Sequence, residues 1–261
     1  MIKQGLITVA LTSIILLGDF TASAEDVTFI ACPIYRDTDQ GKKSGCWLSD
    51  DPNSGQRYDI SNSPTKPDWN YGVLVEGTIS DTQDNACGGI TMSPVRVSIL
   101  TDKACTRHML PTETYPGREF VLPDTRVAPL SAPRAKPTPP HGEKTFSLFF
   151  DLDRTFFIYQ LSDHYLDNAI SWIRATEPTA IHITGYADTR SRVIDGFQVE
   201  EAPRLAQERA EKVAFALKRL GVPEDKMTVE WSASPTAWPE QKGAMGLDGP
   251  SRRRVDIKVI P

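Results

Sequence analysis

The C-terminal half of the chain contains two charged residues, Asp188 and Arg209, that could bind the two ends of a zwitterion. The segment from Arg204 to Leu220 has the apolar spacing of a helix, and Arg209 falls within its apolar stripe. At about 100° per residue, that stripe consists of Leu205, Val213, Ala216 and Leu220. A guanidinium cannot lose its charge, so on the core-facing side of a helix it needs a hydrogen-bonded partner. The position of Arg209 therefore predicts a carboxylate beside it.

Asp188 is the acidic member of this pair, which we call the clamp. It ends the Thr-Gly-Tyr-Ala-Asp sequence of residues 184–188, directly after an expected strand, where ligands of α/β sheets gather. An acid there can bind an ammonium, and an inward-facing arginine can bind a carboxylate through two parallel hydrogen bonds. The alternatives are a turn or capping role for Asp188, and for Arg209 a structural ion pair or a side chain extending to solvent.

The elements that would position the clamp alternate along residues 145–261, which we expect to form an α+β domain. The order is β-α-β-α-β with a final strand added. The expected strands cover 146–152, 180–184, 227–231 and 255–260, and a loop covers 186–203. One helix begins at Ser162-Asp163 and ends at Pro178, and the other covers 204–220 and ends before Gly221-Val222-Pro223.

Three motifs of this half resemble those of the OmpA-like peptidoglycan-binding domain family. Residues 184–188, 205–210 (Leu-Ala-Gln-Glu-Arg-Ala) and 252–256 (Arg-Arg-Arg-Val-Asp) are similar to the family's Thr-Gly-His-Thr-Asp, Leu-Ser-x-x-Arg-Ala and Asn-Arg-Arg-Val-Glu. Phe150-Asp151 also looks like the family's first-strand Phe-Asp. In the family the matched Asp and Arg bind the free amine and the carboxylate of diaminopimelate in the peptide stem. The resemblance implies this role for Asp188 and Arg209, supported by Thr184, Gly185, Tyr186, Arg253 and Arg254.

The chain departs from the family pattern around the two charges. The family's His and the Thr after it are Tyr186 and Ala187 here, and its Asn residues before the helix and before the paired arginines are Ala202 and Arg252. The loop from Asp188 to Leu205 is also longer than the family's. These departures keep the clamp and change the hydrogen-bonding rim that sets affinity and stem selectivity.

The first half of the mature chain, residues 25–127, is expected to be an all-β domain, either a sandwich or a barrel. Apolar residues alternate over Tyr71 to Ile79 and Pro94 to Leu100, as in strands. All the cysteines lie in this half: Cys32, Cys46, Cys87 and Cys105. An even number in an oxidising compartment predicts two disulfides, and of the three pairings we favour Cys32–Cys46 and Cys87–Cys105. We find no catalytic or metal spacing, so we expect neither an enzyme nor a cofactor.

Residues 128–144 are expected to link the two domains. They contain Pro129, Pro133, Pro137, Pro139 and Pro140 and are nearly devoid of large apolar residues, so they cannot bury a core. A long loop within one domain is the alternative, but structureless loops of this length are uncommon.

The first 24 residues are typical of a signal peptide. Lys3 supplies a positive charge, Gly5 to Gly18 is almost wholly apolar, and Ala22-Ser23-Ala24 suits signal peptidase. The apolar run is too short for a permanent membrane helix, which needs about 20 residues; an uncleaved anchor is the alternative. We therefore expect a periplasmic, wall-associated protein at the outer membrane. The net charge of -5 argues against a nucleic-acid partner.

These observations together predict an envelope protein that binds peptidoglycan without covalent attachment and tethers a β domain to the wall. A protein partner of the N-terminal domain is expected as well. The first alternative is a degenerate OmpA-like domain that serves as a protein–protein interaction module. The second makes the β domain an enzyme that the wall anchor localises.

The signal sequence and the even cysteine count give a first prediction. We expect the mature protein to begin at Glu25 and to contain no free thiol, as measured by mass spectrometry of a periplasmic extract. Labelling of two or more thiols without prior reduction would contradict the two-disulfide prediction.

Overall fold

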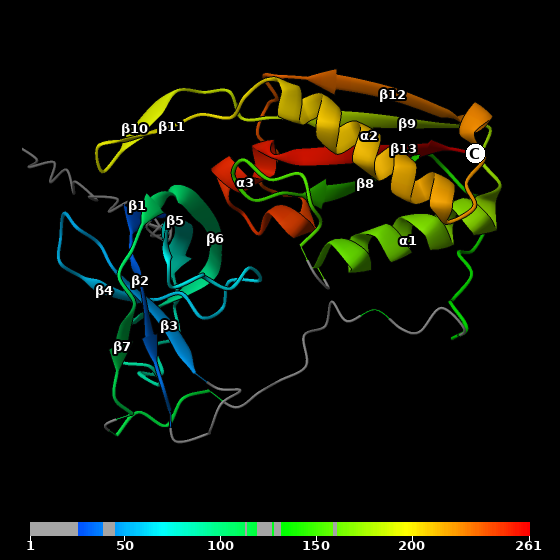
Figure 1. Ribbon diagram of the computed structural model, residues 1–261. Coiled ribbons are helices and arrows are strands. Elements are labelled where there is room, and N and C mark those ends of the chain that lie inside the picture. Colours follow the sequence, from blue (N-terminus) through cyan, green and yellow to red (C-terminus); the bar gives the residue numbers. More distant parts are fainter. Residues whose placement is uncertain (1–25, 39–44, 113, 119–126, 128–131, 159–160) are drawn as a thin grey trace, which may run out of the picture.

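A computed structural model of the chain describes residues 26–38, 45–112, 114–118, 127, 132–158 and 161–261. The expected signal peptide and residues 128–131 of the expected linker lie outside these ranges. Within the described ranges, no helix is both long and apolar enough to cross a bilayer. Figure 1 shows an N-terminal part made of strands beside a C-terminal part in which helices pack against a sheet.

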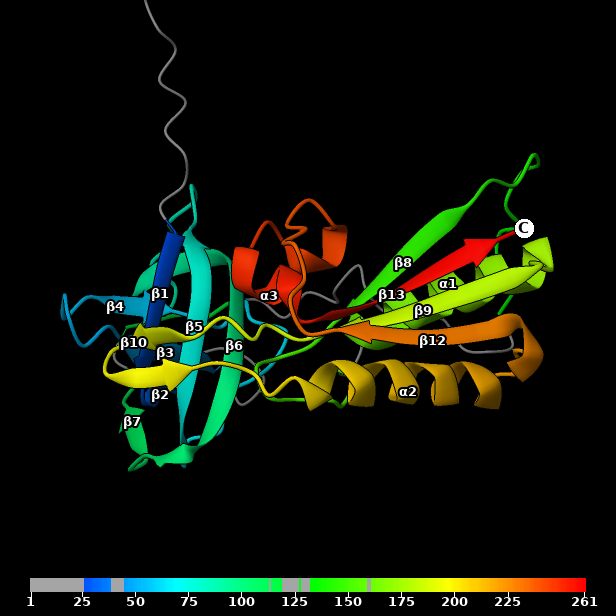
Figure 2. The same cartoon turned by 90° about the horizontal axis from the view of Figure 1, so that it is seen from above.

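The N-terminal part is one seven-stranded sheet that curls strongly on itself (Figure 2). The strand order is β1-β5-β6-β4-β3-β2-β7. The strands are β1 (Asp26–Ala31), β2 (Pro33–Arg36), β3 (Cys46–Asp50), β4 (Arg57–Asp59), β5 (Tyr71–Ile79), β6 (Ile90–Ala104) and β7 (His108–Leu110). Its described residues contain no helix, in agreement with the expected all-β class. The strands form one connected sheet, where the sequence leaves a sandwich and a barrel open.

Strands β5 and β6 pair antiparallel, and both of their faces are buried over much of their length. On one face, Val73 and Val75 of β5 pack with Val95 and Val97 of β6 in the core of the N-terminal part. The residues between them, Leu74 and Glu76 on β5 and Arg96 and Ser98 on β6, are also buried. This second face lies against the C-terminal part.

Two disulfides are present, and the favoured pairing was wrong. The bonds join Cys32 to Cys105 and Cys46 to Cys87. The sheet explains the first bond, because Ala31 pairs with Val73 and Ala104 pairs with Tyr71, so both cysteines flank the start of β5. The bonded cysteines are neighbours in the fold but distant in sequence, so pairing the cysteines in the order of the chain gives the wrong bonds.

The C-terminal part is a four-stranded sheet with two helices on one face. The strand order is β12-β9-β13-β8; β12 is parallel to β9, and β13 is antiparallel to both of its neighbours. The main elements are β8 (Lys144–Phe149), α1 (Leu161–Thr176), β9 (Ala180–Tyr186), α2 (Arg204–Arg219), β12 (Met227–Ser232) and β13 (Arg254–Ile260). This is the expected β-α-β-α-β order with a final strand.

Three short features add to this order. The expected loop after β9 contains a hairpin of β10 (Arg192–Ile194) and β11 (Phe197–Val199). The 3-10 turn η1 (Glu224–Lys226) precedes β12, while η2 (Lys242–Ala244) and helix α3 (Asp248–Arg252) precede β13. Figure 2 shows the hairpin extending from the C-terminal part toward β1 and β5.

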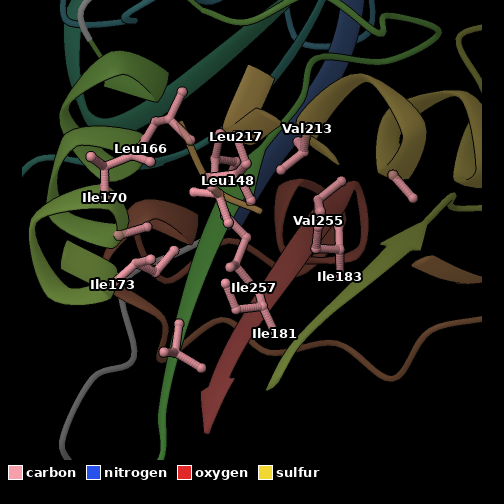
Figure 3. Close-up of a cluster of buried hydrophobic side chains, with 14 of the residues drawn as sticks. Leu148, Leu166, Ile170, Ile173, Ile181, Ile183, Val213, Leu217, Val255 and Ile257 are labelled. Carbon is pink, nitrogen blue, oxygen red and sulfur yellow. The ribbon is translucent and has the colours of Figure 1, made fainter. Parts of the chain in front are cut away.

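The core of the C-terminal part lies between the sheet and the helices (Figure 3). Its labelled residues are Leu148, Leu166, Ile170, Ile173, Ile181, Ile183, Val213, Leu217, Val255 and Ile257. Gly185 permits close packing, because a Cβ there would lie 2.0 Å from the carbonyl oxygen of Ala206. The absence of a side chain thus lets the first turns of α2 approach the end of β9, which places Arg209 over that strand end.

Part of the expected linker contacts helix α1. The guanidinium of Arg134 forms an ion pair of 2.9 Å with Asp167, and the ring of His141 lies 5.6 Å from that of Trp172. The part of the expected linker that follows residue 131 is therefore attached to the C-terminal part at Arg134 and His141.

The disulfides generate a second prediction. Replacing Cys46 and Cys87 together with alanine should lower the free energy of unfolding by about 2–5 kcal/mol, because the bond restricts the unfolded chain. Urea unfolding of the full-length protein measures this loss. Peptide mapping without reduction should recover only the Cys32–Cys105 and Cys46–Cys87 pairs, and a Cys32–Cys46 peptide would contradict the structure.

Candidate functional site

Arg209 is fully buried, and every N–H of its guanidinium has an acceptor within the chain. Nη1 and Nη2 donate to the two carboxylate oxygens of Glu201 at 2.8 and 2.5 Å. The remaining bonds go to carbonyl oxygens: Nε to Arg154 at 2.9 Å, Nη1 to Tyr186 at 2.9 Å and Nη2 to Asp151 at 3.3 Å. The predicted carboxylate partner of Arg209 therefore exists, and it is Glu201.

Glu201 connects the two members of the clamp. Its carboxylate, itself fully buried, accepts hydrogen bonds from the backbone N–H groups of Asp188 at 2.8 Å and Asp153 at 3.0 Å. The N–H of Glu201 donates to the carbonyl of Asp188 at 3.0 Å. Glu201 thus fixes the end of β9 and the guanidinium of Arg209 with one side chain.

Asp188 is also buried, with an exposed fraction of 2%, and it forms a two-point ion pair with Arg190. Nε and Nη2 of Arg190 lie 2.7 and 2.8 Å from its carboxylate oxygens, and Arg192 lies 3.5 Å away. Burial alone would raise the pKa of Asp188. The hydrogen bonds and charge of Arg190, with the charges of Arg192 and Arg253, outweigh burial, so the pKa lies below its usual value.

The two clamp residues lie in the same region, and each already holds a group of the opposite charge. Both internal partners come from the segment between β9 and α2. Arg190 contributes a cation on Asp188, and Glu201 contributes an anion on Arg209. The segment therefore presents to the clamp the two charges that a zwitterionic ligand would present.

The supporting residues named from the family resemblance divide into two groups. Gly185 and the carbonyl of Tyr186 contact α2 on the clamp side of β9. The alternation of β9 places Thr184 and the ring of Tyr186 on the opposite face, where the Tyr186 ring stacks 4.4 Å from the guanidinium of Arg254. Arg254 pairs with Asp256 at 3.0 Å. Arg254 and the ring of Tyr186 therefore do not take part in the clamp.

Arg253 is fully buried and reaches the N-terminal part of the chain. Its Nη2 lies 2.5 Å from Oε2 of Glu76 on β5, in an ion pair shielded from solvent. The same carboxylate lies 3.8 Å from Arg192.

Sequence reasoning missed Glu76, Arg190 and Glu201, although the inward position of Arg209 required an acid. In the described part of the chain, no group of His, Cys, Asp and Glu side chains could hold a metal ion.

Comparison with known proteins gives structural similarities only. No family model and no curated protein matches the chain. Among solved structures, the chain is similar to the OmpA-like domain of FopA1 from Francisella tularensis subsp. tularensis SCHU S4, with 16% identity and a TM-score of 0.36 over 46% of this chain and 73% of that one. It is also similar to the peptidoglycan-associated lipoprotein from Burkholderia pseudomallei, with 25% identity and a TM-score of 0.34 over 44% and 89% of the two chains.

A further similar structure is the cell wall anchor of the T6SS from Pseudomonas aeruginosa, with 19% identity and a TM-score of 0.35. It is covered over 81% of its length, and the match spans 45% of this chain. These three matches span between 44% and 46% of this chain.

The burial of Arg209 generates a third prediction. Replacing Glu201 with glutamine should lower the free energy of unfolding by about 3–5 kcal/mol, because a buried guanidinium would lose its counter-charge. Urea unfolding measures the loss. Glu200→Gln is the matched control, because Glu200 is the neighbouring acid and is exposed. Equal stability of the two variants would contradict a structural role for the Glu201–Arg209 pair.

Proposed function

We propose that the C-terminal part binds peptidoglycan of the cell envelope through the diaminopimelate of the peptide stem, and so tethers the N-terminal part to the wall. The observation that supports this function is that each clamp residue is paired with a group of the opposite charge from the same chain. Asp188 holds a guanidinium and Arg209 holds a carboxylate, so the site accommodates the charges of an amino-acid end. The motif resemblance supports the same two residues. In this proposal the protein is periplasmic and has no catalytic role.

Ligand binding would exchange the internal partners for those of the stem. The side chain of Arg190 is 40% exposed, so an incoming ammonium can replace it on Asp188 without moving the core. The side chain of Glu201 is completely buried, so a ligand carboxylate can reach Arg209 only after the segment before α2 moves. We therefore expect binding to begin at Asp188 and to finish at Arg209.

The same burial favours a second candidate function, a protein–protein interaction module that has lost its affinity for the wall. All five donors of Arg209 are satisfied within the chain, which leaves none free in this conformation. The hairpin also presents Val193, whose exposed fraction is 76%, to solvent. In this alternative the hairpin would contact another envelope protein.

A fourth prediction separates the two functions. Asp188→Ala should weaken binding of the full-length protein to purified sacculi by about 2–5 kcal/mol, because it leaves the ammonium of the ligand unpaired. Arg209→Lys should also weaken binding, for a different reason. Lysine keeps the charge but cannot form two parallel hydrogen bonds. The double variant should lose little more than either single variant, because either change already breaks the clamp. Sedimentation with sacculi over a range of protein concentrations measures affinity.

Two exposed residues provide matched controls for these substitutions. Asp225→Ala and Arg219→Lys make the same chemical changes at exposed positions, the second on the same helix as Arg209, and should leave binding unchanged. Urea unfolding of each variant separates lost binding from lost folding. Wild-type binding that persists unchanged in Asp188→Ala would contradict the clamp, and absence of wild-type binding would favour the interaction module.

A further inference from the structure

We propose that the N-terminal part inhibits the clamp within the same molecule, by holding the segment that carries Arg190 and Glu201 against Asp188 and Arg209. This inference rests on the proposed function, because it concerns the regulation of that site. It assigns to the interface between the two parts a closed state, in which the internal partners occupy the clamp. A ligand gains access when the two parts separate.

The first support is the attachment of the β10–β11 hairpin to the N-terminal part. Its turn residues, Asp195 and Gly196, have φ angles of 50° and 80°, as in a type I′ hairpin turn. The carboxylate of Asp195 accepts hydrogen bonds from the backbone N–H of Ile30 at 2.6 Å and from the amide of Asn53. The hairpin lies between Arg190 and Glu201 in sequence, so this attachment restrains both residues.

Apolar contacts strengthen the attachment. Ile30 and Leu74 of the N-terminal part form one buried cluster with Leu152 and Val199 of the C-terminal part. Leu100, Ile194 and Phe197 pack around this cluster. Separation of the two parts would expose this surface to water, so the hydrophobic effect favours the closed state.

Charged contacts join the N-terminal part to the surroundings of Asp188. Glu76 binds Arg253 at 2.5 Å and lies 3.8 Å from Arg192. Arg192 lies 3.5 Å from Asp188, so Glu76 and Asp188 share one cation. Docking through Glu76 therefore also places Arg192 beside the clamp acid.

A second set of contacts surrounds Arg209. The carboxylate of Asp151 accepts hydrogen bonds from Arg96 at 3.2 Å and Thr65 at 2.6 Å, while its carbonyl accepts one from Arg209 at 3.3 Å. Arg154 donates to the carbonyl of Ile99 at 3.0 Å, and its own carbonyl accepts from Arg209. The backbone around the buried guanidinium is thus fixed by residues of β6 and of the loop before β5.

One feature of the interface opposes docking. Arg96 is fully buried, and within the described part of the chain its Nη1 and Nη2 atoms have no hydrogen-bond partner. Burial of unsatisfied donors is unfavourable, and separation of the two parts would return these atoms to water. Arg96 thus contributes an ion pair with Asp151 to the closed state and also leaves two buried donors without a partner, which lowers the net stability of that state.

The test uses Asp195→Gly in the full-length protein. Glycine keeps the positive φ of the turn and removes the carboxylate that binds Ile30 and Asn53. Gln198→Ala is the matched control, because Gln198 is exposed on the same hairpin, and its amide bonds to Ser191 and Glu200 on the flanks of that hairpin. We expect Asp195→Gly to bind sacculi about tenfold more tightly than wild type, because a larger fraction of molecules is open. Gln198→Ala should bind as wild type does.

Hydrogen exchange of the backbone amides reports opening independently of binding. It should become faster in β1 and in the β10–β11 hairpin of Asp195→Gly, and Glu76→Gln should have the same two effects through a different contact. Adding Asp188→Ala to Asp195→Gly should abolish the gain in binding.

Three outcomes are distinguishable. Faster exchange with tighter binding supports the inference. Faster exchange with binding equal to that of wild type overturns the inhibition and leaves the proposed function intact. Faster exchange with no binding by wild type or any variant overturns the proposed function, and this inference with it.

Discussion

The buried guanidinium of Arg209 is the constraint on which the end of the C-terminal part where β9 meets α2 depends. An arginine cannot become neutral in a protein, so its burial requires a counter-charge and an acceptor for each donor. Glu201 supplies the charge, and three backbone carbonyls supply the remaining acceptors. These carbonyls belong to the end of β9 and to the chain after β8, so one side chain fixes the relative positions of β8, β9 and α2. The absence of a side chain at Gly185 makes this arrangement geometrically possible.

Helical spacing alone placed Arg209 on the inward face of α2 and required an acid beside it, and both expectations are confirmed. The order of strands and helices in the C-terminal part was also predictable, because its elements are long enough for their apolar periods to be recognised. The identity of the acid was not predictable. Glu200 and Glu201 both precede α2, and only the packed structure buries the second. The hairpin was missed because strands of three residues are too short to show alternation, although Asp195-Gly196 is a hairpin turn signal.

The predictions for the N-terminal part failed where long-range contacts decide the outcome. The alternation in β5 and β6 predicted strands, and those strands are present. A polar face normally indicates solvent, yet Glu76, Arg96 and Ser98 are buried against the C-terminal part. The disulfide pairing failed for a related reason, because neighbouring strands of the curled sheet are far apart in sequence. Sequence periods describe one element at a time and carry no information on which elements meet.

The proline-rich segment that joins the two parts has a consequence for competition at the clamp. Fully extended, residues 128–144 would span roughly 50 Å, at about 3.1 Å per residue for a polyproline-like chain. The contacts of Arg134 and His141 with α1 shorten the length that is free to extend. A short tether keeps the N-terminal part at an effective concentration of about 1 mM or more relative to the C-terminal part, however dilute the protein is. In the proposed function, a single peptide stem would therefore compete poorly with the attached N-terminal part, whereas many stems fixed in one wall would raise the local concentration of the ligand. The tether would thus make the protein respond to assembled wall rather than to soluble fragments.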